Sequence, residues 1–289
     1  MVELQKRRRK RVVVLSNSSK RRLETVNRLH ALGLGMCTWL DRASVADGVP
    51  MITVVTSGDL VWNGVREHLR DPGAPAPDAL FDVPGPRCLV YGNGDDDDEY
   101  TATMGCEPAP VEEADFVLAR GLFEVRTRSG ETGVEAYDAA THAGPLLDAA
   151  AARGLPMIVA NPDLVRPDGK DSPMPGVLGA AYEARGGSVR YVGKPHARVY
   201  EEATRCLMED GIARERIVAV GDSMEHDIRG ARRAGIDAVL VTGGVHAAEL
   251  HVPQGEAFEP DAARLEEFLR GYPHDEWPTH VCAGFRFDA

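Results

Sequence analysis

Two aspartates follow an apolar run in the C-terminal half of the sequence. The run 217–220 ends in Gly221, Asp222 comes next, and Asp227 lies five residues later in the segment GDSMEHD. Ligands bind at the carboxyl ends of parallel strands, and a hard cation such as Mg²⁺ prefers carboxylate oxygens there. The spacing therefore predicts that Asp222 binds a metal ion and that Asp227 approaches it from the first turn of a helix. The alternative is that Asp222 caps this helix and Asp227 complements its dipole.

A second polar segment follows the apolar run near the start of the chain. In the segment RVVVLSNSSKRR, a strand is expected to end at Ser16 and Asn17, with a helix after them. Hydroxyl and amide groups beside the free N–H groups of a helix N-terminus bind anions. Ser16 and Asn17 are therefore candidate phosphate-binding residues. An ordinary helix cap is the alternative for both.

A single lysine stands at a third expected strand end. Lys194 lies in the segment VGKPH, and Pro195 suits the first position of the helix that follows. A cation fixed beside a helix N-terminus suits a phosphate group, so Lys194 is a candidate catalytic and phosphate-binding residue. A solvent-facing side chain is the alternative, and we expect that role for His196.

These segments require strands and helices that alternate along the chain. Short, continuous, β-branched runs indicate strands buried on both faces, as in parallel sheets with crossover helices. The order of runs and helical patterns predicts an α/β fold. The expected strands are 12–15, 52–55, 88–91, 116–119, 157–160, 189–192, 217–220 and 238–241, and the expected helices are 20–32, 60–69, 137–152, 176–184, 197–209, 225–234 and 262–269.

A change in composition indicates a second domain. The proline-rich stretch 71–87 is typical of a linker, and a glycine pair at 186–187 marks a second crossing. We therefore predict a core of residues 1–79 and 188–289 with an inserted α/β domain at 80–187. The acidic run 95–99 inside the insertion is expected to be a solvated loop, because adjacent like charges repel.

Charge and cysteine usage limit the partners and the compartment. Lys plus Arg number 33 against 45 for Asp plus Glu, a net charge of -12 that argues against a nucleic-acid partner. The five cysteines form no CxxC pair, which favours a reducing, cytoplasmic location. No stretch resembles a signal peptide or the ~20 apolar residues of a membrane span, so we expect no membrane partner. The oligomeric state stays open, with a homo-oligomer among the alternatives.

The order of the three polar segments resembles that of the haloacid dehalogenase-like (HAD) phosphohydrolases. A hydroxyl at a strand end, Gly-Lys-Pro, and Gly-Asp-(four residues)-Asp are similar to motifs two, three and four of that superfamily. An insertion between motifs two and three, with Asn-Pro-Asp at 161–163, resembles the class IIA cap of phosphoglycolate, pyridoxal-phosphate and nucleotide phosphatases. The resemblance implies a Rossmann-like parallel-sheet core, a cap domain, Mg²⁺ as cofactor and a small phosphorylated metabolite as substrate.

The resemblance also implies a role for each candidate residue. The phosphoryl group would lie against motifs two and three, the metal ion against motif four, and the cap residues would face the substrate. The residues so assigned are Ser16 and Asn17 (phosphoryl binding), Lys194 (charge neutralisation), Asp222 and Asp227 (metal), and Asn161 and Asp163 (cap).

One motif of the family is absent. The first HAD motif is a central strand ending in Asp-x-Asp-Gly, which supplies the nucleophile and the general acid and base. No such sequence precedes Ser16, and the Asp-x-Asp spacing at 95–98 lies in the insertion. Loss of this strand would leave two strand edges unpaired, at about 1–3 kcal/mol for each buried backbone group. We therefore expect an N-terminally incomplete phosphatase, inactive as it stands. The alternative is a non-catalytic protein that binds phosphate and metal.

Overall fold

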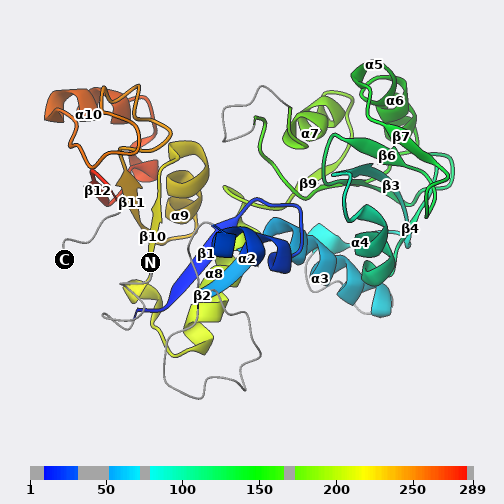
Figure 1. The fold of residues 1–289 in the computed structure, drawn as a ribbon, viewed down its shortest axis with the longest axis horizontal. Helices are drawn as coiled ribbons and strands as arrows, with labels where there is room; N and C mark the ends of the chain where they lie inside the picture. Colours follow the sequence, from blue (N-terminus) through cyan, green and yellow to red (C-terminus); the bar gives the residue numbers. More distant parts are fainter. Residues whose placement is uncertain (1–9, 32–51, 72–78, 166–172, 285–289) are drawn as a thin grey trace. The chain divides into compact units, whose positions relative to one another are not determined.

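The computed structural model describes residues 10–31, 52–71, 79–165 and 173–284 and divides into two compact units. The small-sheet unit comprises residues 1–14, 38–53 and 194–289, and the large-sheet unit comprises residues 15–37 and 54–193. Figure 1 traces the chain through both. Within the described ranges, no helix is long and apolar enough to cross a membrane.

The described strands and helices alternate along most of the chain. Their bounds are β1 (Val12–Ser16), α2 (Arg22–Ala31), β2 (Ile52–Thr56), α3 (Ser57–Arg70), β3 (Arg87–Gly92), α4 (Asp97–Met104), β4 (Glu107–Pro108), β5 (Phe116–Ala119), β6 (Glu124–Arg126), β7 (Val134–Ala136), α5 (Ala139–His142), α6 (Pro145–Ala152), β8 (Met157–Val159), α7 (Gly176–Glu183), β9 (Val189–Tyr191), α8 (Ala197–Glu209), β10 (Val218–Gly221), α9 (Arg229–Arg233), β11 (Asp237–Val241), α10 (Ala262–Leu269) and β12 (His280–Cys282).

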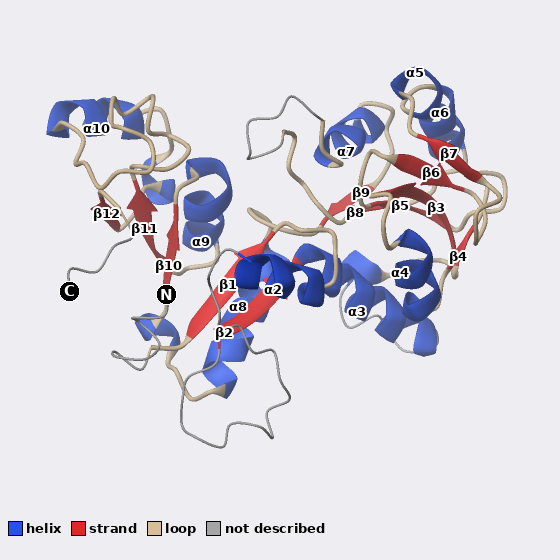
Figure 2. Cartoon of the chain, in the orientation of Figure 1, coloured by secondary structure: helices blue, strands red, loops and turns tan. Residues whose placement is uncertain are grey.

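The large-sheet unit is built on a sheet with the strand order β7-β6-β3-β5-β8-β9, with β4 beside β3. Strands β3, β5, β8 and β9 are parallel, and β6 and β7 add an antiparallel edge. Register aligns Leu89 with Val117 and Val117 with Met157, and these residues pack against Leu147 of α6 and Tyr182 of α7. Helices α3 and α4 lie on the other side of the sheet (Figure 2). The prediction of a parallel α/β fold is confirmed for this sheet. Burial on both faces is confirmed for β3, β5 and β8, whereas the edge strand β9 is only partly buried.

The sequence prediction was wrong at two places in this unit. The expected helix 137–152 is broken into α5 and α6, because Gly144 ends one segment and Pro145, which has no N–H group, begins the next. The acidic run is not a solvated loop, since it forms the first turn of α4, and Asp97 is buried. Carboxylates are stabilised at a helix N-terminus, and buried Arg120 pairs with Asp97.

The small-sheet unit contains the parallel sheet β10-β11-β12, with β10 at its edge. We expected β10 to be buried on both faces, yet Val218 is 51% exposed and Val220 is 42% exposed. An edge strand has one neighbour only, and no described element covers the face that carries these two valines. The apolar run therefore predicted the strand correctly and its burial wrongly.

Strands β1 and β2 form a separate two-stranded sheet, and the boundary between the two units falls within both of them. The division into 1–79 with 188–289 and 80–187 stays a prediction. β9 follows residue 187 in the chain but pairs with β8, and the segment after β1 belongs to the same unit as β3–β9. Residues 72–78 of the expected linker lie outside the described residues.

Glu276 joins the helix α9 to the segment before β12. Its carboxylate accepts hydrogen bonds from Arg229 Nε at 2.8 Å and from Arg233 Nη2 at 2.6 Å, and its side chain is only 7% exposed. Burial alone would raise the pKa of Glu276, but the two guanidinium groups outweigh burial and hold the pKa below its usual value. A depressed carboxyl pKa stabilises the fold at pH values above the unfolded pKa.

We predict that Glu276→Gln lowers the free energy of unfolding at pH 7 by about 1–3 kcal/mol, because charge-assisted hydrogen bonds are lost. The difference from the parent chain should shrink as the pH falls below the usual carboxyl pKa of 4.5, because this carboxyl group takes up a proton in the unfolded chain before it does in the folded one. Urea unfolding from pH 7 to pH 3 measures this. Glu267→Gln, at an exposed position, is the control. A difference independent of pH would contradict the prediction.

Candidate active site

The loop that follows β1 is fixed to the start of α3. We call residues 16–20 the 16–20 loop. The carbonyl oxygen of Ser18 accepts hydrogen bonds from the backbone N–H of Gly58 at 3.0 Å and from Ser57 Oγ at 3.1 Å. The carbonyl oxygen of Lys20 accepts one from Thr56 Oγ1 at 3.0 Å. Ser16 Oγ accepts from the N–H of Ser18 at 3.2 Å, so this hydroxyl also shapes the turn.

Two predicted site residues from distant segments meet in the large-sheet unit. Asn17 is buried, and its Nδ2 donates a hydrogen bond to Asp163 Oδ1 at 2.7 Å. Asn161 plays a different part, because its Oδ1 accepts from the backbone N–H of Asp163 at 2.9 Å and closes the turn after β8. Asn161 therefore shapes the turn, whereas Asp163 also binds Asn17.

Gly193 allows the chain to pass close to this pair. Its φ of +131° is a conformation that residues with a Cβ rarely adopt. A Cβ at this position would lie 2.7 Å from Pro162 Cδ and 2.8 Å from Asn17 Oδ1. The segments after β1, β8 and β9 thus converge, and a side chain at residue 193 would separate them.

In the small-sheet unit, Lys194 pairs with Asp227. Lys194 Nζ lies 2.7 Å from Asp227 Oδ1, with the two side chains 20% and 15% exposed. Asp227 Oδ2 accepts from the backbone N–H groups of Asp222 at 3.2 Å and Ser223 at 3.1 Å. Both carboxylate oxygens of Asp227 are therefore engaged, one by the lysine and one by the loop after β10.

The segment that carries Asp227 is a wide π-helical turn, Met224–Ile228, rather than the regular helix we expected at 225–234. Its N-cap is Ser223, whose Oγ accepts from the N–H of His226 at 3.2 Å. Asp222 is therefore not the helix cap. Its Oδ2 accepts instead from the N–H of Val245 at 3.0 Å, in the loop after β11.

The donor set fits a hard cation only in part. Mg²⁺ requires several oxygen ligands in octahedral geometry. Over the residues described, no group of three or more His, Cys, Asp or Glu side chains is arranged to hold a metal ion. Asp222 Oδ2 is held by Val245, and the rest of that carboxylate is suited to a cation, whereas Asp227 is occupied by Lys194. The described residues thus offer one well-placed carboxylate, not a complete metal site.

Residues 191–266, which contain Lys194, Asp222 and Asp227, match a family model described as HAD-hydrolase-like. The chain superimposes on a haloacid dehalogenase-like hydrolase from Brucella suis 1330 with a TM-score of 0.61, over 99% of this chain and 88% of that one. This chain has the HAD fold. The two sequences are 23% identical, so the likeness shows the HAD fold and not an activity. No curated protein matches the chain in sequence.

Two further structures with the HAD fold are phosphatases by description. A p-nitrophenyl phosphatase from Archaeoglobus fulgidus has a TM-score of 0.60 and 22% identity, over 98% of this chain and 87% of that one. A glycerol phosphate phosphatase from Mycobacterium tuberculosis, solved in complex with calcium, has a TM-score of 0.50 and 22% identity, over 87% of this chain and 65% of that one.

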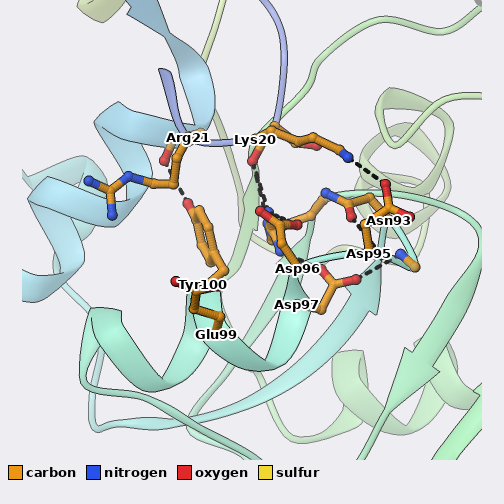
Figure 3. Close-up of polar contacts among 12 residues, drawn as sticks. Lys20, Arg21, Asn93, Asp95, Asp96, Asp97, Glu99 and Tyr100 are labelled. Carbon is orange, nitrogen blue, oxygen red and sulfur yellow. Dashed lines mark hydrogen bonds and ion pairs between the residues drawn. The ribbon is translucent and has the colours of Figure 1, made fainter. Parts of the chain in front are cut away.

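Sequence reasoning missed Arg120, which follows β5 directly. Two of its partners, Asp96 and Asp97, are labelled in Figure 3, which shows polar contacts between the start of α4 and Lys20 of the 16–20 loop. Lys20 forms an ion pair with Asp95, and Asn93 Oδ1 accepts from the N–H of Asp95. A charged residue directly after the buried run 116–119 was the signal that could have indicated a buried ion pair.

We predict that Asp163→Ala lowers the free energy of unfolding by about 1–2 kcal/mol, because Asn17 Nδ2 loses a charged acceptor in a partly buried place. Asp163→Asn keeps an acceptor oxygen and should cost less than half as much. Chemical denaturation of the two variants measures the difference. Equal losses would show that Asp163 acts through the turn, as Asn161 does.

Proposed function

We propose that this chain provides the phosphate- and metal-binding parts of a Mg²⁺-dependent phosphomonoester hydrolase of HAD class IIA, acting on a small phosphorylated metabolite in the cytoplasm. The Lys194–Asp227 pair beside Asp222 carries the proposal. A lysine ammonium held by a carboxylate has a fixed position, and a fixed cation stabilises charge on a phosphoryl group without reorganisation. Two proteins with this fold are described as phosphatases, which supports phosphate-ester hydrolysis as the reaction.

In this proposal, each residue acts through the group that its surroundings leave available. Ser16 would bind a phosphoryl oxygen through its hydroxyl proton, since its oxygen accepts from Ser18. Asn17 would lie beside it, oriented by Asp163. Lys194 would neutralise the phosphoryl charge. Asn161 and Asp163 would belong to the part that contacts the remainder of the substrate.

Asp222 would supply one carboxylate to Mg²⁺, and the bound ion would supply charge neutralisation and orientation of the phosphoryl oxygens. The calcium in the Mycobacterium tuberculosis phosphatase supports cation binding in this fold. We assign Asp227 chiefly to Lys194, because both of its oxygens are already engaged. Asp227 would still lie next to the metal ion, because its Oδ2 binds the backbone N–H groups of Asp222 and Ser223.

Turnover would need a nucleophile that the described residues do not supply. No Asp-x-Asp-Gly precedes Ser16 in the sequence. The edge position of β10 among the described strands supports the proposal that a further strand pairs with it in the enzyme. The absence of Asp-x-Asp-Gly before Ser16 also supports the second candidate, a phosphate- and metal-binding protein without catalysis. The reading frame upstream of Met1 distinguishes the two, since the enzyme requires a strand ending in Asp-x-Asp-Gly there.

We predict that the chain binds inorganic phosphate and that Lys194→Met weakens binding by about tenfold, the effect of losing one charge-assisted hydrogen bond. Isothermal titration in the presence of Mg²⁺ measures the dissociation constants. Lys10→Met, at an exposed position before β1, is the control and should bind as the parent does. Absence of binding by the parent chain would refute the proposed function. Equal affinities for the two variants would refute the role of Lys194.

We also predict that this chain does not hydrolyse p-nitrophenyl phosphate with Mg²⁺, because the nucleophile is absent.

When a strand ending in Asp-x-Asp-Gly is added to the N-terminus, Asp222→Asn should raise the Mg²⁺ concentration required for half-maximal rate far more than Asp227→Asn does. In that enzyme, Asp163→Ala should alter the preference among phosphate esters and leave the Mg²⁺ requirement unchanged. EDTA-sensitive turnover by the unextended chain would contradict the prediction that this chain does not hydrolyse p-nitrophenyl phosphate.

A further inference from the structure

Arg120 is the largest of the fully buried side chains in the described part of the chain, and the proposed function gives it no part. It follows the last residue of β5, and its side chain is 0% exposed. A buried guanidinium is costly unless its charge is neutralised and its N–H groups are bound. The partners that satisfy Arg120 therefore indicate what the residue does.

The charge of Arg120 is neutralised within the large-sheet unit. Its Nη1 pairs with Asp97, whose side chain is also 0% exposed, and its Nη2 lies 2.9 Å from Asp96 Oδ1. The guanidinium carbon lies 3.6 Å from the centroid of the Tyr100 ring, a cation–π contact. Because two carboxylates and a ring surround it, Arg120 adds no net positive charge that would attract an anion.

The remaining N–H groups of Arg120 point to the 16–20 loop. Nε and Nη2 donate to the carbonyl oxygen of Ser19 at 3.4 and 3.3 Å. Tyr100, which lies under the guanidinium, donates its hydroxyl to the carbonyl oxygen of Gly58 at 2.6 Å, and Gly58 N–H donates to Ser18. The same cluster therefore holds the loop at two successive residues.

The carbonyl oxygens of residues 18, 19 and 20 all accept hydrogen bonds. Ser18 is held by α3, Ser19 by Arg120 and Lys20 by Thr56. A carbonyl oxygen that turned toward a phosphate would repel it. With these carbonyl oxygens bound elsewhere, the loop keeps them away from an anion, and they need not move when an anion binds.

We propose that Arg120 is a positioning residue for the phosphoryl-binding loop: it fixes the Ser19 carbonyl so that the loop keeps an anion-binding conformation. This inference rests on the function proposed for Ser16 and Asn17. A purely structural role would be met by any acceptor for these N–H groups, whereas here the acceptor is a backbone carbonyl of the loop itself. Lysine could replace the charge but not the planar fork that reaches Asp96, Asp97 and Ser19 together.

The test uses the full chain and three variants. Arg120→Met combined with Asp97→Asn removes both charges, so no buried carboxylate is left unpaired. Asp97→Asn alone retains Arg120 and its bond to Ser19. Arg126→Met is the matched control, since Arg126 joins α4 to β6 through Asp98 and Glu124 and none of its recorded partners lies in the loop.

Two readouts are expected to separate loop positioning from general stability. The dissociation constant for inorganic phosphate should rise about tenfold in the double variant, as for a loss near 1.4 kcal/mol, and change less than about threefold in Asp97→Asn and Arg126→Met. Amide hydrogen exchange at residues 18–20 should accelerate in the double variant only. Melting temperatures, which should fall in the double variant and in Arg126→Met alike, show that lost stability is not the cause.

The outcomes distinguish this inference from the proposed function. Unchanged exchange at residues 18–20 in the double variant overturns the positioning role, whatever the affinities are. An affinity loss of equal size in Arg126→Met also overturns it. If the parent chain binds no phosphate, the proposed function fails, and the exchange comparison alone then decides whether Arg120 positions the loop.

Discussion

Parallel strands deliver their carboxyl ends to the same edge of a sheet, and the large-sheet unit depends on this constraint. β3 leads into the acidic turn before α4, β5 into Arg120, β8 into Asp163, and β9 into Gly193. Each of these strand ends meets the 16–20 loop or a residue that binds it. One short loop thus contacts segments more than 100 residues apart in sequence, because hydrogen bonding between the strands brings their ends together.

The charged groups around Arg120 and around Asp227 are stabilised in the same way. Arg120 is neutralised by carboxylates, and its remaining N–H groups donate to a backbone carbonyl oxygen. Asp227 is neutralised by Lys194, and its second oxygen accepts hydrogen bonds from two backbone N–H groups. In each case one charged side chain, buried for Arg120 and partly buried for Asp227, both neutralises a partner and fixes a loop. Pairing offsets part of the cost of desolvating such charges, whereas removal of one partner leaves the other uncompensated and is strongly destabilising.

Much of the fold follows from the sequence, and the failures have definite causes. Continuous apolar runs identify the parallel strands, but the short antiparallel strands β6 and β7 carry too few residues to show a period. The run 95–99 looks repulsive because the sequence does not reveal that Arg120 lies against it. Burial of β10 depends on its neighbours in the sheet, which a single apolar run cannot specify. The seven candidate residues lie at strand ends or in adjoining turns as expected, yet the pairing of Lys194 with Asp227 spans 33 positions and is a property of the tertiary structure.

The exposed edge of β10 also bears on how the protein behaves in concentrated solution. A strand at the edge of the described sheet that carries two exposed valines is a template on which another chain can add a strand. Natural proteins usually protect such edges with charge or a covering segment. In the part of the chain that the structure describes, neither device protects Val218 and Val220. Aggregation during expression and concentration would therefore begin at β10, and a lysine in place of one of these valines is the change that would suppress it.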